Sequence, residues 1–190
     1  LGSFGGFAGS TLAAFAYFWL AKVERRMELA DAVAWAFPVA WAFGRLGCAM
    51  VHDHLGQITQ SPIAVKCCAM WVAPTAQFVV APLSDACTQG PRYDLGLTEL
   101  ALTPILFAVV LGVARRTRRP GMISGAFAIA YAVIRFPLDF LRATDLGPDS
   151  DPRYGGLTPA QYACLFTVLF GAWMLHRARS HDPLPLPQSA

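Results

Sequence analysis

The sequence is poor in charge. Only 14% of its 190 residues are Lys, Arg, Asp or Glu, whereas soluble domains carry about 25%. Hydrophobic residues make up 55% of the chain, and the mean hydropathy is +0.44. A soluble domain of this size would leave several long apolar segments without a core to bury them. The composition therefore predicts an integral membrane protein, with a single transmembrane bundle over residues 1–180.

The chain also lacks the patterns of several common sites. Its five cysteines include no Cys-x-x-Cys pair, so we expect neither a structural zinc site nor another metal or cofactor. A disulfide from Cys87 to Cys67 or Cys68 is conceivable only in an extracytoplasmic loop. Neither a glycine-rich phosphate loop nor a Ser-His-Asp arrangement can be assembled. The basic residues flank apolar runs, which argues against nucleic-acid binding. Because the chain starts at Leu1 without a leader, we expect the N-terminal part of a longer protein to be missing.

Five apolar runs are predicted to form transmembrane helices, which makes the chain an all-α, polytopic membrane helix bundle. They are Phe4–Ala21, Ala30–Gly44, Leu97–Val113, Met122–Phe140 and a last run that ends at Leu175. Thr158 and Pro159 are typical of the N-cap and first residue of that last helix. Pro62 precedes Ile63–Leu83, and Lys66, Pro74 and Pro82 interrupt it, so we predict an interfacial or re-entrant segment. The proline-rich residues 181–190 are predicted to be a disordered cytoplasmic tail.

Basic residues indicate the cytoplasmic side. Nine of the 15 Lys and Arg residues follow the first, third and last runs. If these places are cytoplasmic, the positive-inside rule orients all five helices consistently, with a cytoplasmic C-terminus. Charges that gather at a membrane face indicate a functional site. The polar residues predicted at the extracytoplasmic face are Arg45, His52, Asp53, His54, Arg92, Glu99, Arg135, Asp139 and Arg142.

Arg45 ends the second apolar run and lies between Gly44 and Gly47. A cation at this depth is costly in lipid unless it has a partner, and glycine lets backbone or ligand come close. Either the side chain snorkels to the interface, or it binds the phosphate of a lipid. The His-Asp-His sequence at 52–54 does not have the spacing of a metal site, but either imidazole suits a general base.

Arg135, Asp139 and Arg142 are spaced to share one face of a helix. They form either a neutral ion-pair stripe, or a set in which Asp139 holds one arginine while the other binds a phosphate. Glu99 lies near the start of the third run, where the helix dipole favours an acid. Alternatively, Glu99 orients an arginine across the bundle.

Five motifs occur in the order found in a known family. They are Phe4-Gly5-Gly6-Phe7, Gly44-Arg45-Leu46-Gly47 with Asp53 and Gly56, Arg92 to Glu99, Tyr131 to Arg142, and Gly156-Leu157-Thr158 with Gln161. Over nearly the whole chain, this set resembles the prolipoprotein diacylglyceryl transferase family of bacterial membrane enzymes. The chain resembles a diverged and N-terminally incomplete member.

The resemblance implies a transferase of the bacterial inner membrane. It would move a diacylglyceryl group from phosphatidylglycerol to the lipobox cysteine thiol of a prolipoprotein, in the signal-peptide region, and glycerol phosphate would leave. Arg45 and Arg135 would bind the lipid phosphate and stabilise the leaving group, for which guanidinium groups are well suited. Gly47, Asp53 and Gly56 would complete the phosphatidylglycerol site. The supporting residues would be Gly5, Gly6, Glu99, Asp139 and Arg142.

The chain departs from the family pattern at Phe4, where the family has a histidine, and at Cys48, where asparagine is usual. We hypothesise that His52 or His54 replaces the missing histidine as the catalytic base. Two other functions remain open. One is a catalytically impaired relative that binds anionic phospholipid or prolipoprotein, and the other is an anion transporter. Transport would require polar residues along several helices, and the first and last runs have almost none.

Overall fold

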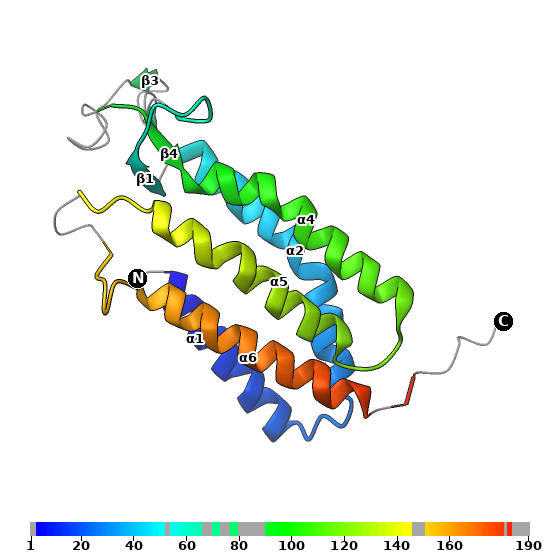
Figure 1. Ribbon diagram of the computed structural model, residues 1–190. Coiled ribbons are helices and arrows are strands. Elements are labelled where there is room, and N and C mark those ends of the chain that lie inside the picture. The colour runs from blue at the N-terminus through cyan, green and yellow to red at the C-terminus, as the bar shows by residue number, and fades with distance from the viewer. Residues whose placement is uncertain are drawn as a thin grey trace.

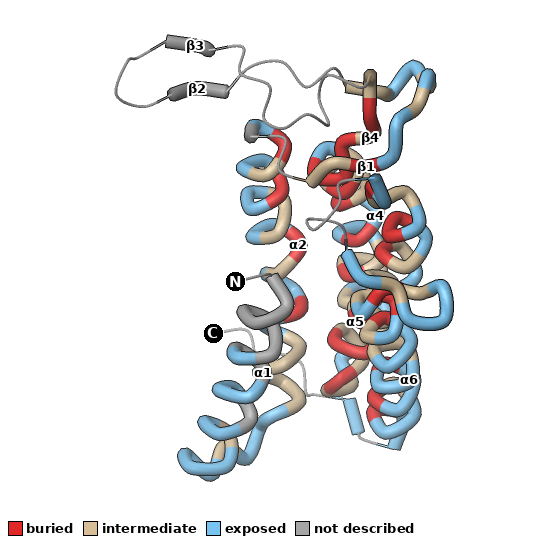
Figure 2. Tube along the Cα trace, turned by 90° about the vertical axis from the view of Figure 1, so that its left-hand side faces the viewer, coloured by how far each residue is buried: buried red, intermediate tan, exposed pale blue. Residues whose placement is uncertain are grey.

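The computed structural model describes residues 3–51, 54–65, 70–72, 77–79, 90–145, 151–180 and 182–183. Long helices dominate this part of the chain and lie roughly parallel (Figure 1). They are α1 (Ser3–Leu20), α2 (Arg26–Val51), α4 (Leu95–Arg116), α5 (Met122–Leu138) and α6 (Pro159–Arg179). Helix α2 packs against α4, and α5 packs against α6. Helix α5 also contacts α2 and α4. Figure 2 shows that buried residues are distributed over these four helices, while much of their outer surface is exposed.

Three helical segments are long and apolar enough to cross a membrane. They are Arg26–Met50, Leu95–Arg116 and Met122–Leu141. The prediction of a largely helical membrane protein is therefore confirmed. That α1 and α6 also span the membrane, giving five spans, stays a prediction.

Two helix ends differ from the prediction. The second apolar run was expected to end at Arg45, but α2 continues to Val51, because glycines are tolerated within membrane helices. The fourth helix was expected to reach Phe140, but regular α-helix ends at Leu138 and a 3-10 turn, η1 (Asp139–Leu141), follows. Pro137 lacks a backbone N–H and so weakens the last helical turn.

The predicted N-terminus of the last helix is confirmed. The side chain of Thr158 accepts a hydrogen bond from the backbone N–H of Gln161, and the Gln161 side chain accepts one from the backbone of Thr158. Pro159 occupies the first helical position. This reciprocal capping box satisfies two backbone donors that would otherwise lack partners.

Glycines bring α5 and α6 into close contact. A Cβ atom on Gly125 would lie 3.0 Å from the carbonyl oxygen of Gly171, and one on Gly171 would lie 2.8 Å from Cγ1 of Ile129. Neither position has room for a side chain, so the two backbones approach closely, as small residues allow in membrane helix pairs.

Asp31 joins the beginning of α2 to the beginning of α5. Its carboxylate accepts hydrogen bonds from the backbone N–H groups of Gly121 (2.7 Å) and Ser124 (2.8 Å), and from the Ser124 hydroxyl (2.6 Å). An acid at a helix N-terminus is favoured by the helix dipole. Nearby, Nη1 of Arg119 donates to the carbonyl oxygen of Arg179 (2.9 Å). The turn after α1, the turn after α4 and the end of α6 therefore lie at one end of the bundle (Figure 1).

Short strands lie at the opposite end. Strand β1 (Leu55–Ile58) pairs antiparallel with β4 (Arg92–Asp94). Within the predicted interfacial segment, β2 (Met70–Val72) and β3 (Gln77–Val79) form a second antiparallel pair. The other residues of that segment beyond position 65, and the three cysteines considered for a disulfide, are outside the described residues. Most of the predicted C-terminal tail also lies outside them.

Candidate functional site

Two arginines from different helices meet on one carboxylate. Nε of Arg45, on α2, lies 2.8 Å from Oε2 of Glu99 on α4, and Nη1 of Arg135, on α5, lies 2.5 Å from Oε1. All three residues are buried, with exposed fractions of 6%, 5% and 8% in the order Arg45, Glu99 and Arg135. Arg45 thus lies inside the bundle and does not reach out to solvent. Glu99 is more than a residue at a favourable helix end, because it bridges arginines from two other helices.

Asp139 extends this cluster towards α6. Nη2 of Arg135 lies 2.8 Å from Oδ1 of Asp139, and Nε of Arg142 lies 3.0 Å from the same oxygen. The hydroxyl of Thr158 donates to the other oxygen, Oδ2. Arg142 follows η1 in an extended conformation, so it reaches Asp139 without sharing a regular helix face with it. Arg142 also pairs with Asp151 at the surface.

The buried part of the cluster is electrically balanced. Arg45 and Arg135 supply two positive charges, and Glu99 and Asp139 supply two negative charges. Buried ions are tolerated in low-dielectric surroundings only when paired and hydrogen-bonded. Arg135 contacts both carboxylates, whereas the ion pair that Arg45 forms is with Glu99. The Nε–H of Arg45 makes no hydrogen bond within the described part of the chain, despite its short distance to Glu99.

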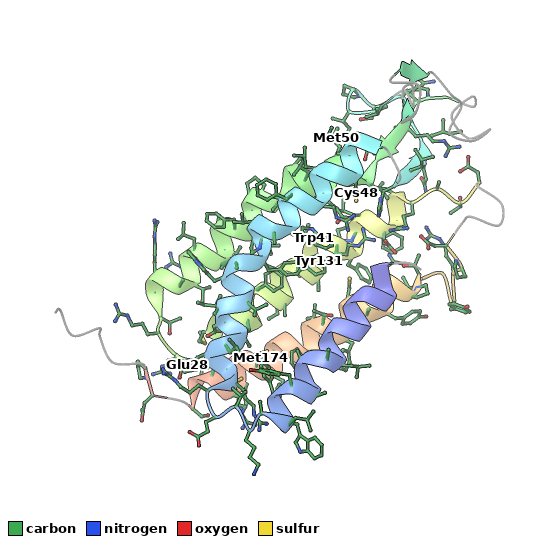
Figure 3. All side chains as sticks on the ribbon, turned by 180° about the vertical axis from the view of Figure 1, so that it is seen from behind. Glu28, Trp41, Cys48, Met50, Tyr131 and Met174 are labelled. Atoms are coloured by element: carbon green, nitrogen blue, oxygen red, sulfur yellow. The ribbon has the colours of Figure 1, made fainter. Side chains whose placement is uncertain are left out.

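One aromatic ring packs against Arg45 on its N-terminal side. Cζ of Arg45 lies 4.3 Å from the ring centroid of Trp41. Trp41 meets Tyr131 of α5 edge to face, with centroids 5.7 Å apart, and stacks on Phe37 at 5.4 Å. Figure 3 shows Trp41 and Tyr131 next to each other between α2 and α5. On the other side, Nη1 of Arg45 lies 4.0 Å from Sγ of Cys48.

A small cavity adjoins the cluster. Its volume is about 20 Å³, enough for roughly one water molecule. Polar groups and apolar side chains from α2, α4 and α5 contribute to its wall. The lining residues are Trp41, Glu99, Leu102, Thr103, Leu106, Tyr131, Ile134, Arg135 and Leu138.

The β1–β4 sheet joins the end of α5 to the site. The carbonyl oxygen of Gly56 accepts from Nη1 of Arg92 (3.1 Å), and Gly56 forms a β-bridge with Arg142. Arg92 also binds Asp145 through two hydrogen bonds, of 3.0 and 2.5 Å. These hydrogen bonds from Arg92 hold the pKa of the Asp145 carboxyl below its ordinary value, because they favour the charged form. A Cβ on Gly56 would lie 2.7 Å from Cβ of Tyr93, so this glycine is required for the close approach.

The structure does not bring the remaining predicted site residues that it describes into contact with the arginine cluster. Gly47 faces open space, since a Cβ there would meet no described atom within 4 Å. His54 follows the end of α2, and its carbonyl oxygen accepts from the backbone N–H of Leu95 (3.0 Å). His52 and Asp53 lie outside the described residues. Gly5 and Gly6 lie in α1, and the structure describes no side-chain surroundings there.

Trp41 was missed as a site residue from the sequence. The only signal in the sequence is that Trp41 lies one turn before Arg45 on the same helix. The long side chain of Arg45 points back towards the N-terminus and therefore meets the ring of Trp41. The same spacing connects many residues that have no special contact. Asp31 was missed as a cap of α5 because its partners are about ninety positions away in the chain.

The fold and the cluster define a class. The protein is a helical membrane protein in which charges from several helices are buried against one another. Intramembrane charges of this kind mark functional sites.

Comparison with known proteins then gives the family. The family model for prolipoprotein diacylglyceryl transferase matches residues 1–177. Proteins called phosphatidylglycerol–prolipoprotein diacylglyceryl transferase are similar to this chain. That of Pseudomonas putida (strain W619) is 31% identical over 96% of this chain and 62% of its own length. That of Pseudomonas fluorescens (strain Pf-5) is 32% identical over 94% of this chain and 61% of its own length. The chain belongs to the prolipoprotein diacylglyceryl transferase family, and it spans about 62% of the length of these relatives.

Proposed function

We propose that this protein transfers a diacylglyceryl group from phosphatidylglycerol to the lipobox cysteine thiol of prolipoproteins. The observation that carries the proposal is the meeting of Arg45 and Arg135 on Glu99. Family membership supports the reaction type, because the similar proteins carry this activity in their names.

In the proposed reaction, the lipid phosphate binds first to Arg45, which contacts fewer carboxylates than Arg135 among the described residues. Arg135 is held by two carboxylates and contributes positive charge at a fixed position. The acceptor thiol gives its proton to His52 or His54. The sulfur then forms a bond to the terminal glyceryl carbon, while the bond from that carbon to the phosphate oxygen breaks. Glycerol phosphate leaves with the electron pair, and the arginines stabilise its added negative charge.

The site is proposed to face the extracytoplasmic side of the bacterial inner membrane. The basic turns and the end of α6 lie at the opposite end of the bundle, and the positive-inside rule would make that end cytoplasmic. In this orientation, the arginine cluster lies near the headgroups of the outer leaflet, where the lipid phosphate is found.

The other predicted residues are assigned supporting roles. Gly47 would leave space for lipid on the surface of α2, and Asp53 would contact the headgroup. Gly56 would act by holding β1 against the segment after α5. Asp139 and Arg142 would hold Arg135 in place, and Gly5 and Gly6 would line the site from α1.

Transfer of labelled phosphatidylglycerol lipid to a lipobox peptide in proteoliposomes tests this function. We expect activity in the parent and strong loss in Arg45→Ala and in Arg135→Ala. Arg118→Ala is the control, because that arginine is exposed in the turn after α4. Full activity in both site variants would refute the proposed phosphate role. A parent that binds phosphatidylglycerol without transferring lipid would instead be an impaired, lipid-binding relative.

The proposed base has its own test. Replacing His52 and His54 together by Gln should abolish transfer while leaving phosphatidylglycerol binding intact, because the imidazole is needed only to remove the thiol proton. Unchanged transfer by this double variant would eliminate both histidines as the base.

A further inference from the structure

The two site arginines are held in different ways. Arg135 contacts two carboxylates, at 2.5 and 2.8 Å. Among the described residues, the carboxylate that Arg45 contacts is that of Glu99, and the ring of Trp41 faces its guanidinium at 4.3 Å. A carboxylate neutralises the cation it holds. An aromatic face attracts the cation without adding a formal negative charge.

Trp41 is well placed to fix the guanidinium. Phe37, one turn earlier on α2, stacks on it, and Tyr131 of α5 meets it edge to face. Contacts from two helices therefore set the ring's orientation. The ring in turn restricts where the guanidinium of Arg45 can lie, beside the cavity that Trp41 and Glu99 both line.

We propose that Trp41 is a positioning residue that holds Arg45 for an anionic phosphate without placing a second negative charge beside it. The inference rests on the proposed function, because it names the residue that prepares Arg45 for the lipid phosphate. If a second carboxylate stood where Trp41 stands, Arg45 would be paired as Arg135 is. The phosphate would then have to displace a carboxylate before it could bind. The neutral ring removes this competition and shields one face of the guanidinium from water.

The test compares Trp41→Phe with Trp41→Leu. Phenylalanine keeps an aromatic face, while leucine keeps apolar volume without one. We expect Trp41→Leu to weaken equilibrium binding of glycerol phosphate by about 2- to 30-fold, the range of cation–π interactions at exposed and desolvated sites. Trp41→Phe should recover most of this loss. Transfer by Trp41→Leu should show a raised KM for phosphatidylglycerol with a smaller change in kcat.

Trp173→Leu is the matched control. Trp173 also has an arginine over its ring, Arg177 at 5.7 Å, but that pair lies near the end of α6, at the other end of the bundle. This variant should bind glycerol phosphate as the parent does. A second control places Trp41→Leu in an Arg45→Gln background. If Trp41 acts through Arg45, the tryptophan change should have no further effect on binding there.

The outcomes distinguish the positioning role of Trp41 from the proposed transferase function. Equal binding by Trp41→Leu and parent, or an equal loss in the Arg45→Gln background, overturns the role of Trp41 and leaves the transferase function standing. Failure of Trp41→Phe to recover binding overturns it as well, because the aromatic face would then be irrelevant. A parent that binds glycerol phosphate through Trp41 and Arg45 but transfers no lipid supports the positioning role and refutes the proposed function.

Discussion

Replacement of Glu99 by glutamine should destabilise the protein strongly. The change keeps the side chain's shape but removes the negative charge between Arg45 and Arg135, which lie 2.8 and 2.5 Å from its two oxygens. Breaking one buried ion pair by removing a partner destabilises by about 3–5 kcal/mol. Glu99 serves two buried arginines, so we expect the upper part of this range. For a chain of this size, a loss of about 4–5 kcal/mol corresponds to a fall in Tm of about 8–20 °C.

Thermal unfolding of detergent-solubilised protein, followed by circular dichroism, measures this effect. Glu28→Gln is the matched control, since Glu28 forms an i,i+3 pair with the exposed Arg25. That variant should leave Tm nearly unchanged, because exposed ion pairs contribute little. Adding Arg45→Gln to Glu99→Gln removes one uncompensated cation, so the double variant should be no less stable than Glu99→Gln alone. A Tm for Glu99→Gln that matches Glu28→Gln would refute the buried-bridge reasoning.

Three further predictions concern the surroundings of the site. Asp145→Asn should lower the stability of the protein at pH values above 3.8, the ordinary pKa of this carboxyl. The difference in stability between the variant and the parent should disappear as pH falls through the lowered pKa of Asp145 in the folded state. A difference in unfolding midpoint that is constant with pH would contradict this. Gly56→Ala should lower the free energy of unfolding by about 1–3 kcal/mol through overpacking. By contrast, a Cβ on Gly44 would meet no described atom within 4 Å, so Gly44→Ala should raise the free energy of unfolding by about 0.5–1 kcal/mol. A similar loss of stability in both variants would refute the packing argument. A maleimide should label the half-buried Cys48 faster than the buried Cys164, as measured by peptide mass spectrometry. Added glycerol phosphate should slow the labelling of Cys48 and leave that of Cys164 unchanged. Faster labelling of Cys164 would contradict the structure.

Local patterns in the sequence were sufficient for the helices. Thr158 and Pro159 predicted the start of α6 because a capping box depends on neighbouring residues alone. Apolar length located α1, α4 and α5 to within a few residues, except where Pro137 precedes the 3-10 turn. Gly44 and Gly47 misled the prediction for α2, because glycine ends helices in water more readily than in a membrane bundle.

Partners across the bundle could not be predicted in the same way. The sequence indicated that Arg45, Glu99 and Arg135 lie at one membrane face, and it left open whether Glu99 orients an arginine. It could not show that one carboxylate serves both arginines, since this depends on the rotation of three helices about their axes. Strands β1 and β4 have four and three residues, too few for an alternating pattern to be detected.

The division of the cluster between two helix pairs has a mechanical consequence. Arg45 and Glu99 belong to α2 and α4, which contact each other at Gly96 and Cys48, whereas Arg135 belongs to the glycine-packed pair α5 and α6. Asp31 joins the two pairs at the far end of the bundle through its hydrogen bonds to the start of α5. A tilt of one pair against the other about this junction would therefore separate Arg135 from Glu99 and break the ion pair that links the two helix pairs.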